Sequence, residues 1–248
     1  MPPLDWHARY VQQAGWTSQT RYYLYERSRL KKAHRVLEVG CGTGALLAEL
    51  PAYSQAEIHG LDISLPNARQ ADRNAPSSRI VCGDGNNLPY PNHSFDIVFC
   101  HFLLLWVETP SALLREMKRV TKPGGNVLAL AEPDYSGRID FPPELEPLGR
   151  LQASSLKAQG ADPNAGRQLR SWFVSAGIPL IESGIMAGGW SAPPTHEQRE
   201  LEWAVIESDL AGNLSAQDIR RLKLIDESAW ENAVRVLYVP TFYAWGRA

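Results

Sequence analysis

The chain contains few cysteines and no recognisable metal-binding cluster. Cys41, Cys82 and Cys100 are the three cysteines in 248 residues, an odd number without Cys-x-x-Cys spacing. This argues against a disulfide framework and a structural zinc site, and it favours a reducing compartment. Because no His/carboxylate cluster recurs at helical spacing, we also expect no metal cofactor.

An excess of either charge is also missing. The chain has 25 Lys and Arg against 27 Asp and Glu, a net charge of −2, so it lacks the basic footprint of a nucleic-acid-binding protein. No apolar run approaches the roughly 18 residues of a spanning helix, and the first residues lack the regions of a signal peptide. We expect a cytoplasmic protein without nucleic-acid binding or membrane insertion.

Residues 35–47, Arg-Val-Leu-Glu-Val-Gly-Cys-Gly-Thr-Gly-Ala-Leu-Leu, are the most informative stretch. They predict a buried strand, a turn with glycines at 40, 42 and 44, and an apolar-faced helix. Glycine suits a tight turn whose bare backbone a ligand approaches closely, and the free N–H groups of a following helix would face that ligand. The spacing is G-x-G-x-G and not the dinucleotide spacing G-x-G-x-x-G.

From residue 35 onward, apolar strands alternate with helical patterns, which is typical of a parallel sheet covered on both faces. The chain length allows one large α/β domain with embellishments. Strands are predicted at 35–39, 57–62, 79–83, 95–101 and 126–131, and helices at 43–50, 64–74 and 111–120.

The flanks are predicted with less regular patterns. Residues 6–30 read as helical, with Asp5 as a cap, a break at Gly15 and a restart at Thr17 or Ser18. After Glu132 we expect helices at 143–159 and 165–176, a strand at 179–187, a helical stretch at 195–235 and a final strand at 234–247. Pro240 within the last strand indicates an edge or a bulge.

Three later segments extend the pattern. Gly60-Leu-Asp62-Ile-Ser ends the second strand with a carboxylate that can accept hydrogen bonds from both ribose hydroxyls of an adenosine. The alternative is that Asp62 simply caps the next helix. Cys82-Gly-Asp84-Gly-Asn-Asn-Leu-Pro-Tyr follows the third strand, and its Asp-Gly and Asn-Asn pairs also suit a plain turn. Ser94-Phe-Asp-Ile-Val precedes the Lys122-Pro-Gly-Gly turn.

Taken in order, these four segments resemble class I S-adenosylmethionine (SAM) methyltransferases, in the ubiquinone/menaquinone-biosynthesis-like (methyltransferase type 11) branch. The resemblance covers residues 33–132 strongly. It implies an α/β fold with a Rossmann-like seven-stranded, mostly parallel sheet, an antiparallel last strand, helices on both faces and helical lid elements. We divide the chain into an N-terminal helical lid, 1–32, and a SAM-binding domain, 33–248, with a helical insertion at about 195–235.

The resemblance also implies the cofactor, SAM, with S-adenosylhomocysteine as product. In the family the acid at the position of Glu38 holds the amino group, and that of Asp84, with the next amide, binds adenine. From the N-terminal helix Arg21 is a candidate for the SAM carboxylate. The expected cofactor-binding residues are Arg21, Glu38, Gly40, Cys41, Gly42, Gly44, Asp62, Ile63, Asp84, Gly85, Asn86 and His101.

Methyl transfer from a sulfonium is an in-line displacement, and it needs a base only if the acceptor must lose a proton. His101 is the candidate catalytic residue, and Glu132, Asp134 and Tyr135 are further candidates for the base. Signatures of DNA amino-methyltransferases and cytosine C5 enzymes are missing, so we predict a small-molecule acceptor, with an apolar or aromatic one suited to the aromatic-rich flanks. A protein or RNA target and an NAD(P)-binding oxidoreductase remain alternatives, and the oligomeric state is left open.

Overall fold

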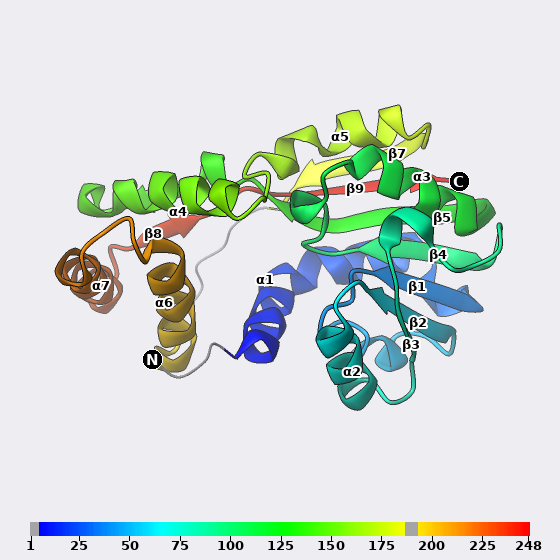
Figure 1. Ribbon diagram of the computed structural model, residues 1–248, viewed down its shortest axis with the longest axis horizontal. Helices are drawn as coiled ribbons and strands as arrows, with labels where there is room; N and C mark the ends of the chain where they lie inside the picture. Colours follow the sequence, from blue (N-terminus) through cyan, green and yellow to red (C-terminus); the bar gives the residue numbers. More distant parts are fainter. Residues whose placement is uncertain (1–4, 187–192) are drawn as a thin grey trace.

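The computed structural model describes residues 5–186 and 193–248, and it is built around one seven-stranded sheet (Figure 1). The strand order is β3-β2-β1-β4-β5-β9-β7. The first five strands in this order are mutually parallel, and β9 runs antiparallel between β5 and β7. This confirms the predicted fold class. The strands are β1 Arg35–Val39, β2 Glu57–Asp62, β3 Arg79–Cys82, β4 Phe95–Cys100, β5 Thr121–Pro133, β7 Leu180–Ile185 and β9 Thr241–Arg247.

Helices cover both faces of this sheet because alternate residues of each strand point to opposite sides. In β1, Leu37 and Val39 pack with apolar side chains of α3 (Pro110–Val120) and α5 (Ala165–Ser175). Val36 packs on the other face with side chains of α1 (Trp6–Arg27) and α2 (Leu65–Asn74). The carboxyl ends of the parallel strands therefore meet at one edge, between two helical layers.

A second, smaller lobe lies beside the sheet and has its own apolar core. It consists of the helices α4, α6 and α7 and a two-stranded sheet of β6 and β8 (Figure 1). Trp203, Ile206 and Leu210 of α6 lie in this core with Leu145 and Leu148. The bounds are β6 Ile139–Phe141, α4 Glu146–Ala158, α6 His196–Leu210, α7 Ala216–Glu231 and β8 Val236–Tyr238.

Short 3₁₀ turns connect several of these elements, at Leu30–Lys32, Leu50–Ala52, Gly85–Asn87, Leu104–Trp106, Tyr135–Gly137 and Pro143–Leu145. Among the residues described, no helix combines the length and apolar character that crossing a membrane requires.

The predicted break in the first helix is wrong, because α1 is continuous from Trp6 to Arg27. Asp5 caps it as predicted, with its side chain accepting the N–H of Ala8 at 3.0 Å. Gly15 faces open space, so its cost of about 1 kcal/mol relative to alanine is tolerated where neighbouring turns pack on the sheet. Thr17, expected as a second cap, lies buried in mid-helix instead.

The predicted helix at 43–50 is also wrong, since this stretch forms a series of tight turns. Ala48 N–H bonds to the carbonyl of Gly44 as in an α-helix, but Glu49 N–H bonds three residues back, to Leu46. Pro51 then lacks the N–H that a continuing helix would need. Leu46, Leu47 and Leu50 are nevertheless all buried, so burial of these leucines and not helical geometry accounts for the apolar run.

The last predicted strand is in fact two strands. Pro240 separates β8, which pairs with β6 in the small lobe, from β9, which lies inside the main sheet. Proline fits this junction because it cannot donate to a ladder. Sequence periodicity did not reveal β6, a three-residue strand.

Candidate active site

The glycine turn after β1 has the backbone that its sequence predicted. Gly40, Gly42 and Gly44 have φ of 72°, 52° and 82°, a region that favours glycine. The amides of Gly40 and Cys41 donate to the carbonyl of Leu61 at 2.7 and 3.0 Å, which ties the turn to β2. A Cβ on Gly42 would lie 3.2 Å from the ring of Tyr10, so α1 passes directly over the turn.

Asp62 fixes the same turn from the end of β2. It is 8% exposed, and its Oδ2 accepts the N–H of Gly42 at 2.8 Å while Oδ1 accepts that of Ser64 at 2.9 Å. The cap of α2 is Ser64, whose hydroxyl accepts from Asn67, and not Asp62. Each carboxylate oxygen keeps a further lone pair for a ligand hydroxyl. Ile63 beside it is 74% exposed, an unusual position for a large apolar side chain.

Glu38 provides a test of whether this site fits the amino end of SAM. The residue is buried at the end of β1, and its Oε2 has no hydrogen-bond partner among the residues described. Burial, together with the charges of Glu49 and Asp62, raises the pKa of Glu38 well above its usual value. Because an unpartnered buried carboxylate is costly, an ammonium group bound against it would compensate. The residues therefore fit the cofactor.

Asp84, expected at the adenine, lies exposed after β3 and accepts from the backbone and side-chain amides of Asn86 at 2.9 and 3.1 Å. Gly85 is buried, with a position for Cβ only 2.9 Å from Leu113. The structure thus brings this loop to the same sheet edge as Asp62, while the contact with adenine stays a prediction.

Arg21 belongs to a chain of hydrogen bonds that ends at His101. Its guanidinium donates to both carboxylate oxygens of Glu49, with Nη2 at 2.9 and 2.8 Å, and to the hydroxyl of Thr17 at 2.6 Å. Thr17 Oγ1 in turn lies 2.9 Å from His101 Nε2. Arg21 also donates to the carbonyl of Ala14. A contact between Arg21 and the SAM carboxylate stays a prediction, and it would require one of these bonds to be exchanged.

His101 is held in its neutral form by this environment. Burial lowers its pKa well below the usual value, and the positive charge of Arg21 lowers it further. A neutral imidazole of very low basicity is poorly suited to take a proton near pH 7. His101 is therefore better placed to position a ligand by hydrogen bonding than to act as the base.

The lowered pKa of His101 predicts a loss of stability in acid. In the unfolded chain a histidine takes up a proton near pH 6.5, whereas folded His101 does so only at much lower pH. The free energy of unfolding should therefore fall as the pH drops below about 6.5. In His101→Gln the slope should be smaller by up to about 1.4 kcal/mol per pH unit, measured by denaturant unfolding between pH 7.5 and 5. His34→Gln, an exposed control, should keep the wild-type slope; an unchanged slope in His101→Gln would contradict the assignment.

The other candidate bases have structural partners. Glu132 is fully buried and accepts the N–H groups of Leu103, Leu104 and Leu105 at 3.0, 2.9 and 3.3 Å, and burial raises its pKa to about 7. It therefore organises the loop after β4. Asp134 is buried and paired with Arg167.

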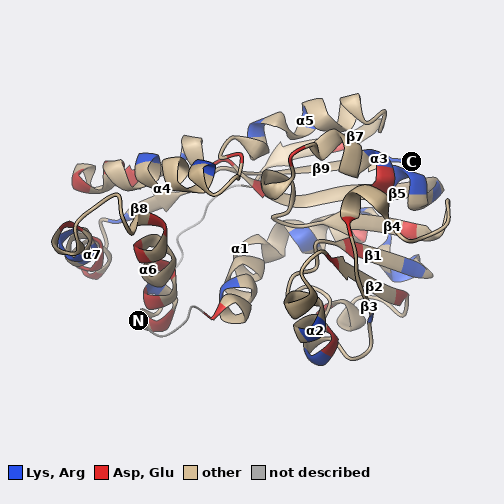
Figure 2. Cartoon of the chain, in the orientation of Figure 1, with Lys and Arg blue, Asp and Glu red and all other residues tan. Residues whose placement is uncertain are grey.

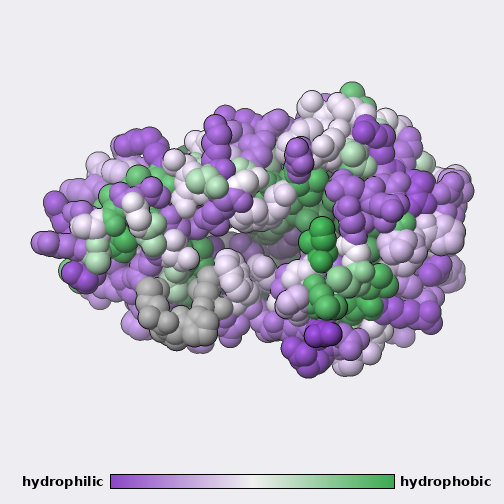
Figure 3. All heavy atoms as spheres, in the orientation of Figure 1, coloured by the Kyte–Doolittle hydropathy of each residue, from purple (hydrophilic) through white to green (hydrophobic). Residues whose placement is uncertain are grey.

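Tyr135 is the candidate base that lies in the wall of a cavity. That cavity, of about 550 Å³, lies between α1 and the small lobe, and Figure 3 shows the surface hollowed there, with green apolar residues along part of the walls. Aromatic side chains from several elements line it: Trp16, Phe102, Tyr135, Trp203, Trp230 and Tyr238. Thr17 lines it too, which brings the cavity to the hydrogen bond with His101.

Sequence reasoning missed several polar residues of this cavity, including Arg9, Gln12 and Glu202. Arg9 and Gln12 share a face of α1 with Trp16, and this spacing of three and four residues was a usable signal once the helix was known to be continuous. Glu202, on α6, gave no such signal, since acidic residues recur along that helix (Figure 2).

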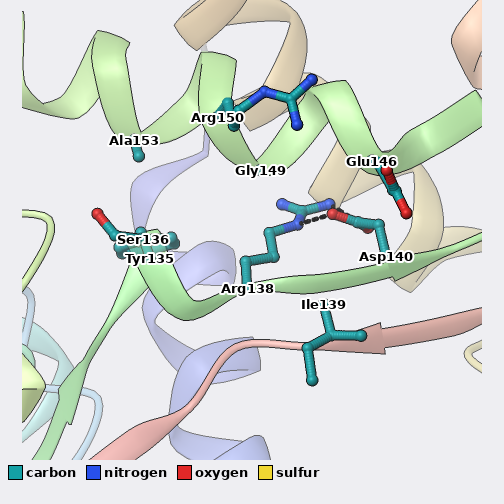
Figure 4. A pocket seen from close by; sticks show the side chains of 9 residues that line it. All are labelled: Tyr135, Ser136, Arg138, Ile139, Asp140, Glu146, Gly149, Arg150 and Ala153. Atoms are coloured by element: carbon teal, nitrogen blue, oxygen red, sulfur yellow. Dashed lines mark hydrogen bonds and ion pairs between the residues drawn. The ribbon is translucent and has the colours of Figure 1, made fainter. Parts of the chain in front are cut away.

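A second cavity of similar volume, about 550 Å³, is lined by residues of α4 and by residues of the segment 135–140, which includes the start of β6 (Figure 4). Tyr135 and Arg138 line both cavities. The guanidinium of Arg138 points at Asp140, with Nε 2.7 Å from Oδ2. Asp140 Oδ1 also accepts a hydrogen bond from Arg235 Nη2 at 2.6 Å. These side chains are 1% exposed, so they form a fixed ion-pair network in the cavity walls.

Within 5–186 and 193–248, no group of three or more His, Cys, Asp or Glu is arranged to hold a metal ion. Independence from metal ions stays a prediction.

Comparison with known proteins identifies similar chains. A family profile described as "Methyltransferase domain" matches residues 37–129. The chain is 35% identical over 243 residues to an uncharacterized methyltransferase of Schizosaccharomyces pombe, covering 93% of this chain and 84% of that protein. It is 31% identical over 179 residues to demethylmenaquinone methyltransferase of Bacillus licheniformis, covering 65% and 77%. A structure of geranyl diphosphate methyltransferase in complex with GPP and sinefungin is similar in fold. Its TM-score is 0.59, its sequence identity is 11%, and the match covers 93% of this chain and 76% of that chain.

Proposed function

The chain belongs to the SAM-dependent methyltransferases, and from that premise we propose that its acceptor is a small molecule bound between α1 and the small lobe. The observation that carries the proposal is the aromatic-lined cavity of about 550 Å³ that reaches Thr17. Cavities of this size hold a small ligand, and their apolar lining excludes water. Demethylmenaquinone methyltransferase, a relative, is named for a small-molecule acceptor. The charged residues that line this cavity are of both signs.

We propose that SAM lies along the edge formed by the ends of β1, β2 and β3. The bound cofactor supplies an activated methyl group on a sulfonium. The carboxylate of Glu38 would hold its amino group, Asp62 its ribose hydroxyls, and Asp84 with the Gly85 amide its adenine. The bare backbone at Gly40, Gly42 and Gly44 leaves room for the approach, with Cys41, Ile63, Asn86 and His101 around it.

The chain's own contribution to the reaction would be placement and exclusion of water. α1 covers the glycine turn with Tyr10 and lines the cavity with Trp16, so one helix shields both ligands. His101, fixed by Thr17, would orient the acceptor or cofactor as a neutral hydrogen-bonding group. This arrangement supports the proposed division into a lid at 1–32 and a SAM-binding domain at 33–248, although α1 also contributes Leu24 and Tyr25 to the core.

Asp62→Ala should weaken SAM binding by roughly ten- to a hundred-fold, about 1.5–3 kcal/mol, because a charged acceptor for two hydroxyls is lost. The variant also removes the partner of the Gly42 amide that shapes the turn. Isothermal titration with SAM measures the effect. Asp72→Ala, at an exposed position of α2, is the matched control and should bind as the wild type; equal affinity in both variants would remove Asp62 from the site.

An acceptor screen that reads out S-adenosylhomocysteine tests the proposed function. Purified protein should release it with at least one class of small molecule, and the rate should be unchanged by a chelator. Turnover only with protein or RNA substrates would overturn the small-molecule assignment. A cytoplasmic location is part of the proposal and is supported by Cys41, Cys82 and Cys100, which are all free thiols.

A further inference from the structure

The charged groups around the acceptor cavity are almost all satisfied by one another. Arg138 bonds to Asp140, and Arg235 joins Asp140 to Asp226 at 2.6 and 2.5 Å. Asp226 also accepts the indole N–H of Trp203 at 2.8 Å. Because these side chains are at most 7% exposed, they form a closed network that shapes the wall and has little capacity left for a ligand.

Glu202 differs from these residues because only one of its oxygens is engaged. Its Oε2 accepts a hydrogen bond from Arg9, whose side chain is 3% exposed. The guanidinium of Arg9 also donates to Gln12 at 2.8 Å and lies 4.7 Å from the centre of the Trp16 ring. The Oε1 of Glu202 has no hydrogen-bond partner among the residues described. Glu202 lines the cavity, and its side chain is 19% exposed. A fixed carboxylate with a free oxygen in an aromatic cavity accepts a hydrogen bond strongly.

Tyr135 provides a hydrogen-bond donor in the same region. It lines the cavity, and its hydroxyl has no partner among the described residues. Burial raises its pKa to about 12, and the charges of Arg9 and Glu202 are close enough to act on it. It therefore stays protonated at neutral pH. A carboxylate that accepts beside a phenol that donates is complementary to a hydroxyl group, which does both.

The charge balance of the walls argues against an ionic acceptor. Four arginines, at 9, 138, 199 and 235, line the cavity with two acids, Glu202 and Asp226, which disfavours a cation. Three of these arginines are already paired and nearly unexposed, so they are not available to an anion. Among the residues that the structure describes, Arg199 donates to the carbonyl of Pro194, at 2.9 Å, and to no acid, and an anionic probe tests it directly.

The length of α1 sets the dimension of the ligand. Arg9 and Thr17 are eight residues apart in one helix, about 12 Å along its axis. Thr17 lines the cavity beside His101, where the proposed function puts the transfer, and Arg9 with Glu202 lines it about 12 Å farther along α1. An acceptor in contact with both positions is therefore elongated, with its body against the aromatic walls.

We propose that Glu202, held by Arg9, is the specificity-determining residue of the acceptor site, and that it selects an uncharged, elongated aromatic acceptor with a hydroxyl group remote from the methylated atom. This inference rests on the proposed function, because that function defines which part of the cavity faces the cofactor. Tyr135 completes the recognition of the hydroxyl by donating to it.

Titration calorimetry with the full chain, saturated with SAM, tests the proposal with three probes of one shape. Wild-type protein should bind 2,6-dihydroxynaphthalene about tenfold more tightly than 2,6-dimethoxynaphthalene, which cannot donate a hydrogen bond. It should bind 6-hydroxy-2-naphthoate no more tightly than the diol. No detectable binding of the diol, equal binding of diol and dimethoxy probe, or tightest binding of the naphthoate would each overturn the proposal.

The Glu202→Gln variant separates hydrogen bonding from steric fit. It keeps the size of the side chain and a partner for Arg9, and the tenfold preference for the diol should fall to about twofold or less, whereas a steric preference would persist and would overturn the proposal. Glu197→Gln, at an exposed position in the first turn of α6, should retain the full preference. A titration of SAM into the free protein, done before the probes are added, separates a failure of the proposed function from a failure of this inference. If SAM does not bind, the proposed function is contradicted. If SAM binds normally and the probes show no preference, this inference alone is contradicted.

Discussion

The Gly42→Val variant is expected to lose SAM binding by more than a hundred-fold while its fold is retained. Two effects act together. The backbone at Gly42 has φ +52°, which a β-branched residue adopts only with strain. Its side chain would also enter the space between the glycine turn and Tyr10, whose ring lies 3.2 Å from the position of the Cβ. Titration calorimetry with SAM and a thermal melt measure the two quantities separately.

Gly124→Val is the matched control for this experiment. Gly124 has a similar φ, +75°, but a Cβ there meets nothing within 4 Å, and the residue lies in the exposed first part of β5. It should therefore show the cost of backbone strain, on the order of 1–3 kcal/mol, with unchanged SAM affinity. If Gly42→Val binds SAM like Gly124→Val, the cofactor does not lie against this turn.

The Glu132→Ala variant should show the largest loss of stability, about 3–5 kcal/mol. The carboxylate is fully buried and accepts three consecutive backbone N–H groups, those of residues 103–105, and each orphaned buried donor costs about 1–3 kcal/mol. In a chain of this size the melting temperature should fall by roughly 10 °C or more. Differential scanning calorimetry measures it.

Glu132→Ala should also weaken SAM binding in whatever fraction stays folded, since Leu103 in the released loop packs on Gly40, its Cδ1 2.6 Å from a Cβ position there. Glu144→Ala, on an exposed turn of the lobe, is the control and should change neither quantity. A Glu132→Ala protein with wild-type stability but no turnover would contradict the structural role and return Glu132 to the candidate bases.

The parts of the fold that sequence predicted best are those in which one local rule decides. The strands at 35–39 and 57–62 match β1 and β2 because their apolar runs are fully buried. The predicted helices at 64–74 and 111–120 match α2 and α3 to within one residue, and the hydroxyl of Ser64 caps α2 by accepting from Asn67. The glycines of the turn have positive φ, as the need for close backbone approach implied.

The parts that failed depend on contacts between distant segments. Gly15 indicates a break by propensity, but packing of Ala14 and Leu24 on the sheet holds α1 together across it. The turns at 43–50 form where three leucines are buried at once and Glu49 pairs with Arg21. No local pattern gives such pairings.

For the site, the sequence predicted a set of cofactor-binding residues, but it did not predict which other residues these side chains contact in the fold. Arg21 was expected to be free for a ligand, and it is engaged with Glu49, 28 residues away. His101 was a candidate for an acid/base group or an acceptor contact, and burial together with the charge of Arg21 lowers its pKa. Glu202 was not considered, because its role depends on the pairing of α6 with Arg9 of α1, 193 residues distant.

The crossing between sheet and lobe at Pro240 has a consequence for how such a protein can diversify. At this point two adjacent backbone segments pass between sheet and lobe, β5 to β6 and β8 to β9, and they are joined where the Asp134 amide donates to the Pro240 carbonyl at 2.7 Å. The lobe beyond it has a separate apolar core. Under the proposed function, mutations in the lobe would therefore alter the acceptor site while the residues proposed to bind SAM remain unchanged. A laboratory library confined to residues 139–158 and 196–238 would explore acceptor range with the donor site held constant.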